Sequence, residues 1–98
     1  MDCEFSDPKL ECVYTDPDAS IGHGFVVDKN FRKVIGAIRA AHTELDLRAM
    51  KSLHYHKLEG ERSHQHALDI TPQWRLIVER VDEEGRIIIR IVSVEDYH

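Results

Sequence analysis

Three short segments of this sequence contain side chains suited to proton transfer or to binding a negatively charged ligand. They are residues 54–62 (HYHKLEGER), the pair Trp74-Arg75 and the terminal residues Asp96-Tyr97-His98. Histidine titrates near neutral pH and exchanges protons there, arginine binds phosphate oxygens through paired N–H groups, and tyrosine can stack on a nucleobase. His98 is the first candidate for proton transfer, because a chain end reaches a cleft easily.

The histidines also raise the question of a metal site. His54 and His56, like His64 and His66, are separated by one residue, which places both side chains on the same face of a regular strand. Such pairs bind zinc or nickel when neighbouring strands bring them together. No cysteine lies near them in the sequence, and His64 falls in a polar loop. We therefore expect these histidines to face water or phosphate, and we expect neither a metal nor a cofactor.

The elements that must position these segments begin with helices. Apolar residues spaced by three and four predict an amphipathic helix over residues 25–42 and a shorter helix over residues 44–51. Another short helix is predicted from Asp7 to Tyr14, because Asp7 can cap it and Pro8 suits its first position.

After Leu58 the pattern changes to the alternation that is typical of strands. We expect strands at residues 66–70, 74–81 and 86–94, with a hairpin loop at residues 82–85. Because side chains alternate along a strand, Arg75 should face away from the core if Trp74 enters it. Helices followed by strands predict an α+β fold, in which the N-terminal helices pack on a three-stranded antiparallel meander.

Length and composition predict a single domain spanning residues 1–98, since 98 residues with 42% hydrophobic content suit one core. Cys3 and Cys12 are interpreted as reduced thiols, because a bridge so close to the start would constrain little of the chain. No apolar run approaches the roughly 20 residues of a membrane span, and the opening residues are acidic where a signal peptide is basic. We expect a cytoplasmic protein without membrane contact.

The net charge of −5 is unusual for a protein that binds nucleic acid, because Lys and Arg supply the phosphate contacts. Its distribution is uneven. Residues 1–30 hold seven acids and two bases, residues 31–80 hold six acids and nine bases, and residues 81–98 hold five acids and two bases. The middle segment can therefore present a basic face to RNA or to an acidic partner. Surface charge without any pattern is an alternative of similar weight.

The order and spacing of these residues resemble the HigB toxins of the RelE/ParE superfamily. The resemblance rests on a histidine, a Leu-x-Gly-acid-Arg loop at residues 58–62, a strand, the Trp74-Arg75 pair and the closing Asp96-Tyr97-His98. It is closest over residues 53–98 and weaker back to about Phe31. The first 25 residues share only length and an early helix.

This resemblance implies a RelE-like fold and ribosome-dependent cleavage of messenger RNA without a metal, by attack of a ribose 2′-hydroxyl on the adjacent phosphate. The implied site contains His56, Asp96 and His98 for proton transfer, Arg62 and Arg75 for phosphate binding, and Tyr97 for stacking. Lys51 and Lys57 are further candidates for RNA contact. Each residue also has a structural alternative: an ion pair or exposed loop for the arginines, a core-edge or strand-end role for Tyr97 and Asp96, and a simple tail for His98.

The same resemblance implies a set of partners. It predicts neutralisation by a HigA-like helix-turn-helix antitoxin encoded beside the toxin, with operator DNA bound only through the antitoxin complex. The ribosome and messenger RNA would be the partners of the free toxin.

One position departs from the family pattern, because many relatives have Lys where Glu59 stands. An acid there removes a cation and repels phosphate, and Lys57 replaces it only if its side chain reaches the same place. Two alternatives to a full nuclease therefore remain. The first is a catalytically weak homologue that acts mainly as antitoxin partner and co-repressor. The second is a gyrase poison of the ParE branch, which is less favoured because that branch does not need the Asp-Tyr-His ending.

Overall fold

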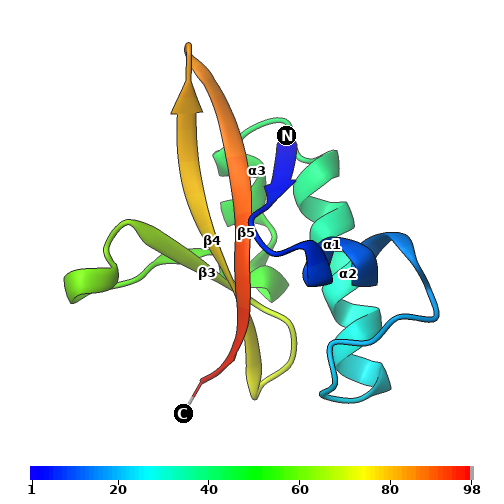
Figure 1. Ribbon diagram of the computed structural model, residues 1–98. Helices are drawn as coiled ribbons and strands as arrows, with labels where there is room; N and C mark the ends of the chain where they lie inside the picture. Colours follow the sequence, from blue (N-terminus) through cyan, green and yellow to red (C-terminus); the bar gives the residue numbers. More distant parts are fainter. Residues whose placement is uncertain (98) are drawn as a thin grey trace.

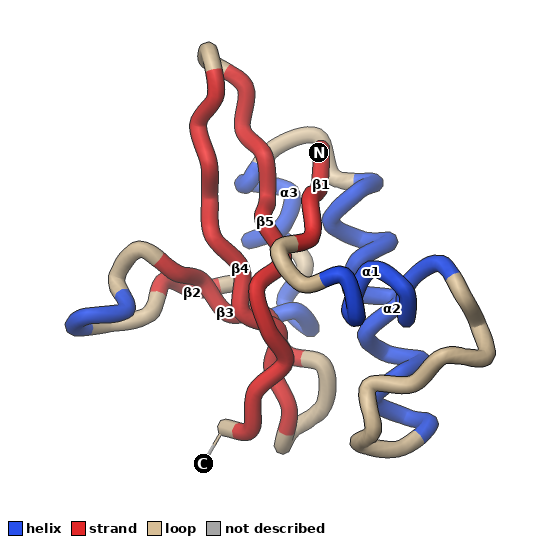
Figure 2. The backbone as a smooth tube through the Cα atoms, viewed as in Figure 1, coloured by secondary structure: helices blue, strands red, loops and turns tan. Residues whose placement is uncertain are grey.

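Three α-helices lie against one side of a five-stranded sheet in the computed structural model, which describes residues 1–97 (Figures 1 and 2). In chain order the elements are β1 (Asp2–Phe5), α1 (Pro8–Thr15), α2 (Phe25–Ala40), α3 (Glu44–Ala49), the 3-10 turn η1 (Lys51–Leu53), β2 (His56–Lys57), the 3-10 turn η2 (Gly60–Arg62), β3 (Gln65–Asp69), β4 (Trp74–Glu83) and β5 (Arg86–Asp96). The α+β prediction with helices packed on a small sheet is confirmed.

The helices α1 and α3 begin at residues whose side chains cap them. Asp7 accepts a hydrogen bond from the backbone N–H of Lys9 at 2.9 Å, and Pro8 occupies the first position of α1, as predicted. In α3, Thr43 and Asp46 form a reciprocal capping box. The buried face of α2 follows the predicted spacing and consists of Val27, Asp28, Phe31, Val34, Ile35 and Ile38.

The sheet contains the predicted antiparallel meander as β3, β4 and β5, but it has two further strands, so the predicted number of strands was wrong. Its strand order is β1-β5-β4-β3-β2, with β1 parallel to β5 and the other neighbours antiparallel. The N-terminal strand was missed because it has four residues and pairs with a strand more than 80 positions further along the chain. β2 was missed because it has two residues.

The β4–β5 hairpin is longer and tighter than expected. Asp82 and Glu83, predicted to be loop, still pair with β5, so the turn consists of Glu84 and Gly85. Both have positive φ, 54° and 81°, which is the geometry of a two-residue turn that matches the twist of the strands.

The core lies between the helices and one face of the sheet. The sheet contributes the buried side chains Leu68, Ile70, Leu76, Val78, Ile89 and Ile91 to it. Because side chains alternate, the intervening residues point to the opposite face, which we call the outer face. None of the helices in residues 1–97 combines the length and apolar composition that crossing a bilayer requires.

Candidate functional site

The outer face carries a row of charged side chains at one end of the sheet. Asp69 of β3 pairs with Arg75 of β4, which pairs with Glu95 of β5. Paired residues on neighbouring strands share a face, so these three side chains lie beside one another. Trp74 packs against the core, and the predicted opposite orientation of Arg75 is therefore observed.

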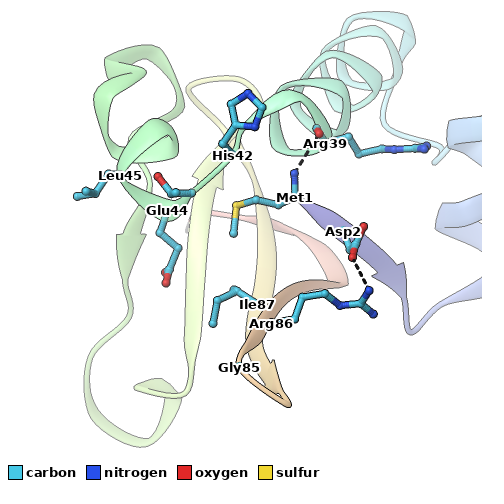
Figure 3. Close-up of a pocket in the computed structure, with 10 residues that line it drawn as sticks. Met1, Asp2, Arg39, His42, Glu44, Leu45, Gly85, Arg86 and Ile87 are labelled. Atoms are coloured by element: carbon cyan, nitrogen blue, oxygen red, sulfur yellow. Dashed lines mark hydrogen bonds and ion pairs between the residues drawn. The ribbon is translucent and has the colours of Figure 1, made fainter.

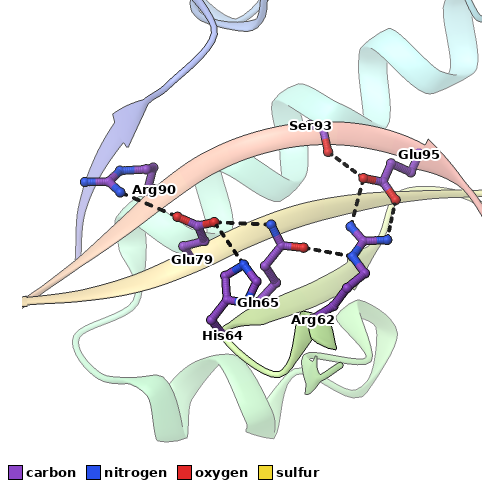
Figure 4. Close-up of polar contacts among 7 residues, drawn as sticks. All are labelled: Arg62, His64, Gln65, Glu79, Arg90, Ser93 and Glu95. Carbon is purple, nitrogen blue, oxygen red and sulfur yellow. Dashed lines mark hydrogen bonds and ion pairs between the residues drawn. The ribbon is translucent and has the colours of Figure 1, made fainter. Parts of the chain in front are cut away.

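Arg62 reaches this face from the loop after β2 and binds Glu95 (Figure 4). Both terminal nitrogens of its guanidinium donate to the two carboxylate oxygens at 2.9 Å, while its Nε donates to Gln65 at 2.9 Å. Ser93 adds a third donor to Glu95. The Arg62 guanidinium, more than the opposing burial, lowers the pKa of Glu95, and the Glu95 carboxylate raises that of Arg62.

Arg75 lies beside Tyr97, and it forms no salt bridge with a side chain of residues 1–97. Its guanidinium carbon is 4.9 Å from the centre of the Tyr97 ring, and its buried Nε has no hydrogen-bond partner within residues 1–97. The Tyr97 hydroxyl donates to Asp69, whose carboxylate is also 3.6 Å from His54. Burial, together with Asp69, raises the pKa of Tyr97 to about 12, so this hydroxyl keeps its proton at neutral pH.

His56 belongs to the same face, because its partner across the strand is Ala67, two positions from Asp69. Its Nδ1 lies 2.6 Å from the carbonyl oxygen of His54, and the two imidazoles stack with ring centres 4.3 Å apart. Because a carbonyl oxygen only accepts, the Nδ1 of His56 carries the proton in this contact.

The two predicted RNA-contacting lysines lie apart from this row. Lys57 pairs with His66, so its side chain leaves the strand on the side opposite to His56. It therefore does not take the place of the missing lysine at Glu59. Lys51 is exposed in η1.

The side chains of Asp96 and Tyr97, near the end of the chain, lie on opposite faces of the sheet. Asp96 pairs with Trp74 and accepts a hydrogen bond from the Gln73 side chain at 3.1 Å, so it lies on the face opposite to Arg75. Tyr97 returns to the outer face, held by a 2.9 Å bond from its backbone N–H to the carbonyl of Gln73. His98, the first candidate for proton transfer, lies outside the described residues.

A second polar network continues the outer face away from Arg75. Glu79 accepts from Gln65 and Arg90 and lies 3.7 Å from His64 (Figure 4). Arg90 also donates to Glu4 at 2.8 Å. Sequence reasoning did not single out these acids, nor Asp69 and Glu95. The alternation that placed Arg75 on this face was the signal that would have found them.

Carboxylates therefore accompany the arginines of the outer face. Arg62 is bound by Glu95 and Arg90 by Glu79 and Glu4, whereas Arg75 faces an aromatic ring. An incoming phosphate must compete with these acids for the first two guanidinium groups. Arg75 lies in a row with Asp69 and Glu95, and Tyr97 covers one side of its guanidinium.

A hollow lies elsewhere on the molecule (Figure 3). It measures about 710 Å³ and is bounded by the N-terminal residues, the segment before α3 and the tip of the β4–β5 hairpin. Arg86 and Asp2 form an ion pair at its wall, with a separation of 3.2 Å. None of the predicted site residues within 1–97 lines it.

The histidine pairs do not assemble a metal site within residues 1–97, where no group of three His, Cys, Asp or Glu side chains is arranged to hold an ion. His66 faces the interior and stacks on Tyr55 with ring centres 4.8 Å apart. Burial lowers its pKa, and its Nδ1 has no partner among the described side chains.

The chain matches a known family and has a fold similar to that of solved structures. The family described as RelE-like toxin of type II toxin-antitoxin system HigB matches residues 3–95. No curated protein matches the chain. Among solved structures, YafQ from E. coli strain BL21(DE3) is similar with a TM-score of 0.62 at 14% identity, over 98% of this chain and 92% of that one. A YoeB/ParE toxin from Agrobacterium tumefaciens is similar with a TM-score of 0.59 at 11% identity, over 100% of both chains.

Proposed function

Because this chain belongs to the family of RelE-like toxins of the type II toxin–antitoxin system HigB, we propose that it is a ribosome-dependent endoribonuclease that cleaves messenger RNA and thereby inhibits translation. The observation that supports this most is the position of Arg75. Its guanidinium lies on the outer face against the ring of Tyr97, in a row with the carboxylates of Asp69 and Glu95. A guanidinium can donate paired hydrogen bonds to phosphate oxygens.

The proposed reaction needs three contributions. A base must remove the proton of the ribose 2′-hydroxyl, an acid must protonate the leaving 5′-oxygen, and cations must stabilise the charge that develops on the phosphate. Because the nucleophile belongs to the RNA itself, no metal-bound water is required. We assign the cationic role to Arg75, and to Arg62 once it has left Glu95.

His56 is the best-supported base, because it lies on the outer face and its Nδ1 is held by the carbonyl of His54. Of the two other groups that the resemblance implies for proton transfer, Asp96 lies on the face opposite to Arg75, so we assign the second proton transfer to His98. Tyr97 is proposed to stack on a base with the side of its ring that Arg75 does not cover. Lys51 and Lys57 would contact RNA only at its periphery.

The proposed partners are the ribosome, messenger RNA and a HigA-like helix-turn-helix antitoxin that binds the operator for the complex. We further propose that the protein acts in the cytoplasm as one domain spanning residues 1–98. The acidic N-terminal third would suit a basic antitoxin surface.

Expression of the chain alone in a bacterium tests this proposal. We expect growth arrest with cuts inside translated codons, and loss of both in Arg75→Ala and in a chain without Tyr97 and His98. His42→Ala is the matched control, because this exposed histidine lies before α3 and away from the outer face. Harmless expression of a folded wild-type chain would favour instead a weak homologue that acts as antitoxin partner and co-repressor.

A further inference from the structure

The loop between α1 and α2 is held in one conformation by two side chains of α2. The guanidinium of Arg32 donates to the backbone carbonyls of Val13 and Ala19, each at 2.8 Å, and also to those of Asp16 and Pro17. Asp28, which is buried, accepts from the backbone N–H of Ile21 at 2.9 Å. These contacts order the loop before any ligand arrives, which reduces the entropic cost of binding.

This loop presents a single imidazole at its tip. His23 is exposed and lies between Gly22 and Gly24, whose φ angles are 103° and 102°. A Cβ at either glycine would meet nothing within 4 Å, so the glycines serve the backbone conformation and not a close contact. With this backbone, the His23 ring stacks on Trp74, with 3.8 Å between ring centres and 13° between planes.

The stacked pair lies at the same end of the sheet as Arg75, on the opposite face. Trp74 precedes Arg75 on β4 and pairs with Asp96 of β5, so the stack shares a face with Asp96. The start of α2, the start of β4 and the C-terminal end all lie at the lower end of the molecule in Figure 1. An RNA strand that places a phosphate at Arg75 would pass this stack as it leaves the end of the sheet.

We propose that the exposed side of the His23–Trp74 stack binds a nucleobase that neighbours the phosphate held by Arg75. This subsite rests on the proposed function and adds a residue from outside the segments that the sequence singled out. Every nucleobase has a π face, so a flat heteroaromatic platform binds bases with little sequence preference. The platform is preformed, because Trp74 is anchored against the core and the loop is fixed by Arg32.

The subsite supplies stacking and not charge. The loop that carries His23 contains Asp16 and Asp18 and no lysine or arginine. At about pH 8.5, where imidazole is uncharged, the contribution of His23 to RNA affinity should be independent of salt, whereas that of Arg75 should depend on it, because an arginine–phosphate contact releases counterions. This difference separates the two groups by experiment.

The test measures the affinity of a short single-stranded oligoribonucleotide for the full chain over a range of salt concentrations. His23→Ala should weaken binding about 5-fold or more with an unchanged salt slope, as expected for the loss of one stacked base. Arg75→Ala should reduce the slope by about 0.7, the value for one phosphate of a single strand. His23→Phe should restore most of the affinity, and His42→Ala is the matched control.

Two further readouts make the test decisive. Trp74 is the only tryptophan of the chain, so its fluorescence should respond to the oligonucleotide and not to inorganic polyphosphate, which has charge without bases. In ribosome-dependent cleavage, His23→Ala should raise KM and leave kcat unchanged.

The possible failures are distinguishable. Unchanged RNA affinity in His23→Ala, together with weakened binding in Arg75→Ala, would overturn the subsite and assign the exposed His23 and Phe25 to a contact with protein. A wild-type chain that neither binds nor cleaves RNA would overturn the proposed function itself.

Discussion

Replacing Glu95 with Gln should strengthen RNA binding, because this residue holds an arginine that the proposed reaction needs. The carboxylate of Glu95 receives both terminal nitrogens of Arg62 at 2.9 Å. A glutamine of nearly the same shape accepts only one of these bonds and has no charge. The change should therefore release the guanidinium without leaving a gap in the outer face.

The size of the effect follows from the exposure of the pair. The side chains of Arg62 and Glu95 are 40% and 33% exposed, so solvent screens their attraction. Screened pairs contribute about 0.2–1 kcal/mol, and the bidentate geometry favours the upper end of that range. Removing a competitor of about 1 kcal/mol should tighten RNA binding about 5-fold. One additional phosphate contact should also steepen the salt slope by about 0.7.

Fluorescence anisotropy of a labelled single-stranded RNA, titrated at several salt concentrations, measures both quantities. Glu83→Gln is the matched control, because it makes the same change of charge at the distant end of β4. A Glu95→Gln chain that binds RNA as poorly as Arg62→Ala would refute the reasoning, since Glu95 would then orient Arg62 for RNA instead of withholding it.

Three further predictions concern single side chains. Asp69→Asn should lower the pKa of Tyr97, which is raised from 10.0 to about 12, so the absorbance of tyrosinate should develop at lower pH. In the wild-type chain the folded state holds this proton more tightly than the unfolded state does. Its stability should therefore decrease as pH rises from 10.0 to about 12. Burial lowers the pKa of His66 from 6.5, so stability should decrease as pH falls below that value, and His66→Phe should flatten the decrease in urea unfolding. Glu59→Lys should increase cleavage and steepen the salt slope of RNA binding, because it places a cation where the chain has an acid.

Each of these has a contradicting outcome. Tyrosinate absorbance that is identical in Asp69→Asn and wild type would show that the hydrogen bond does not control Tyr97. An acid-induced loss of stability that persists in His66→Phe would move the titrating group elsewhere. Glu59→Lys with unchanged cleavage would show that this exposed position does not meet the substrate.

The sequence was most informative where structure is determined locally. The capping of α1 by Asp7 and the opposite faces of Trp74 and Arg75 follow from neighbouring residues, and both were predicted. The strand β1 was not predicted, because its stability comes from pairing with β5 at the other end of the chain. Local alternation gives no information about such a partner.

For the candidate site as well, local sequence patterns were informative and long-range contacts could not be predicted from them. Residue types and spacing identified His56, Arg62 and Arg75, but the partner of Arg62 is 33 positions away. Only the register of β4 and β5 brings Glu95 to this arginine and converts a predicted free cation into an ion pair. His23 was missed for a similar reason, since the loop before α2 meets β4 only in the folded chain.

The most direct test combines the purified protein with ribosomes that carry a defined messenger RNA. Cleavage through the ribose 2′-hydroxyl should leave a 2′,3′-cyclic phosphate on the upstream fragment, only when the ribosome is present, and Arg75→Ala should abolish it. Intact messenger RNA under the same conditions, or cleavage that Arg75→Ala leaves unchanged, would contradict a nuclease site on the outer face of this sheet.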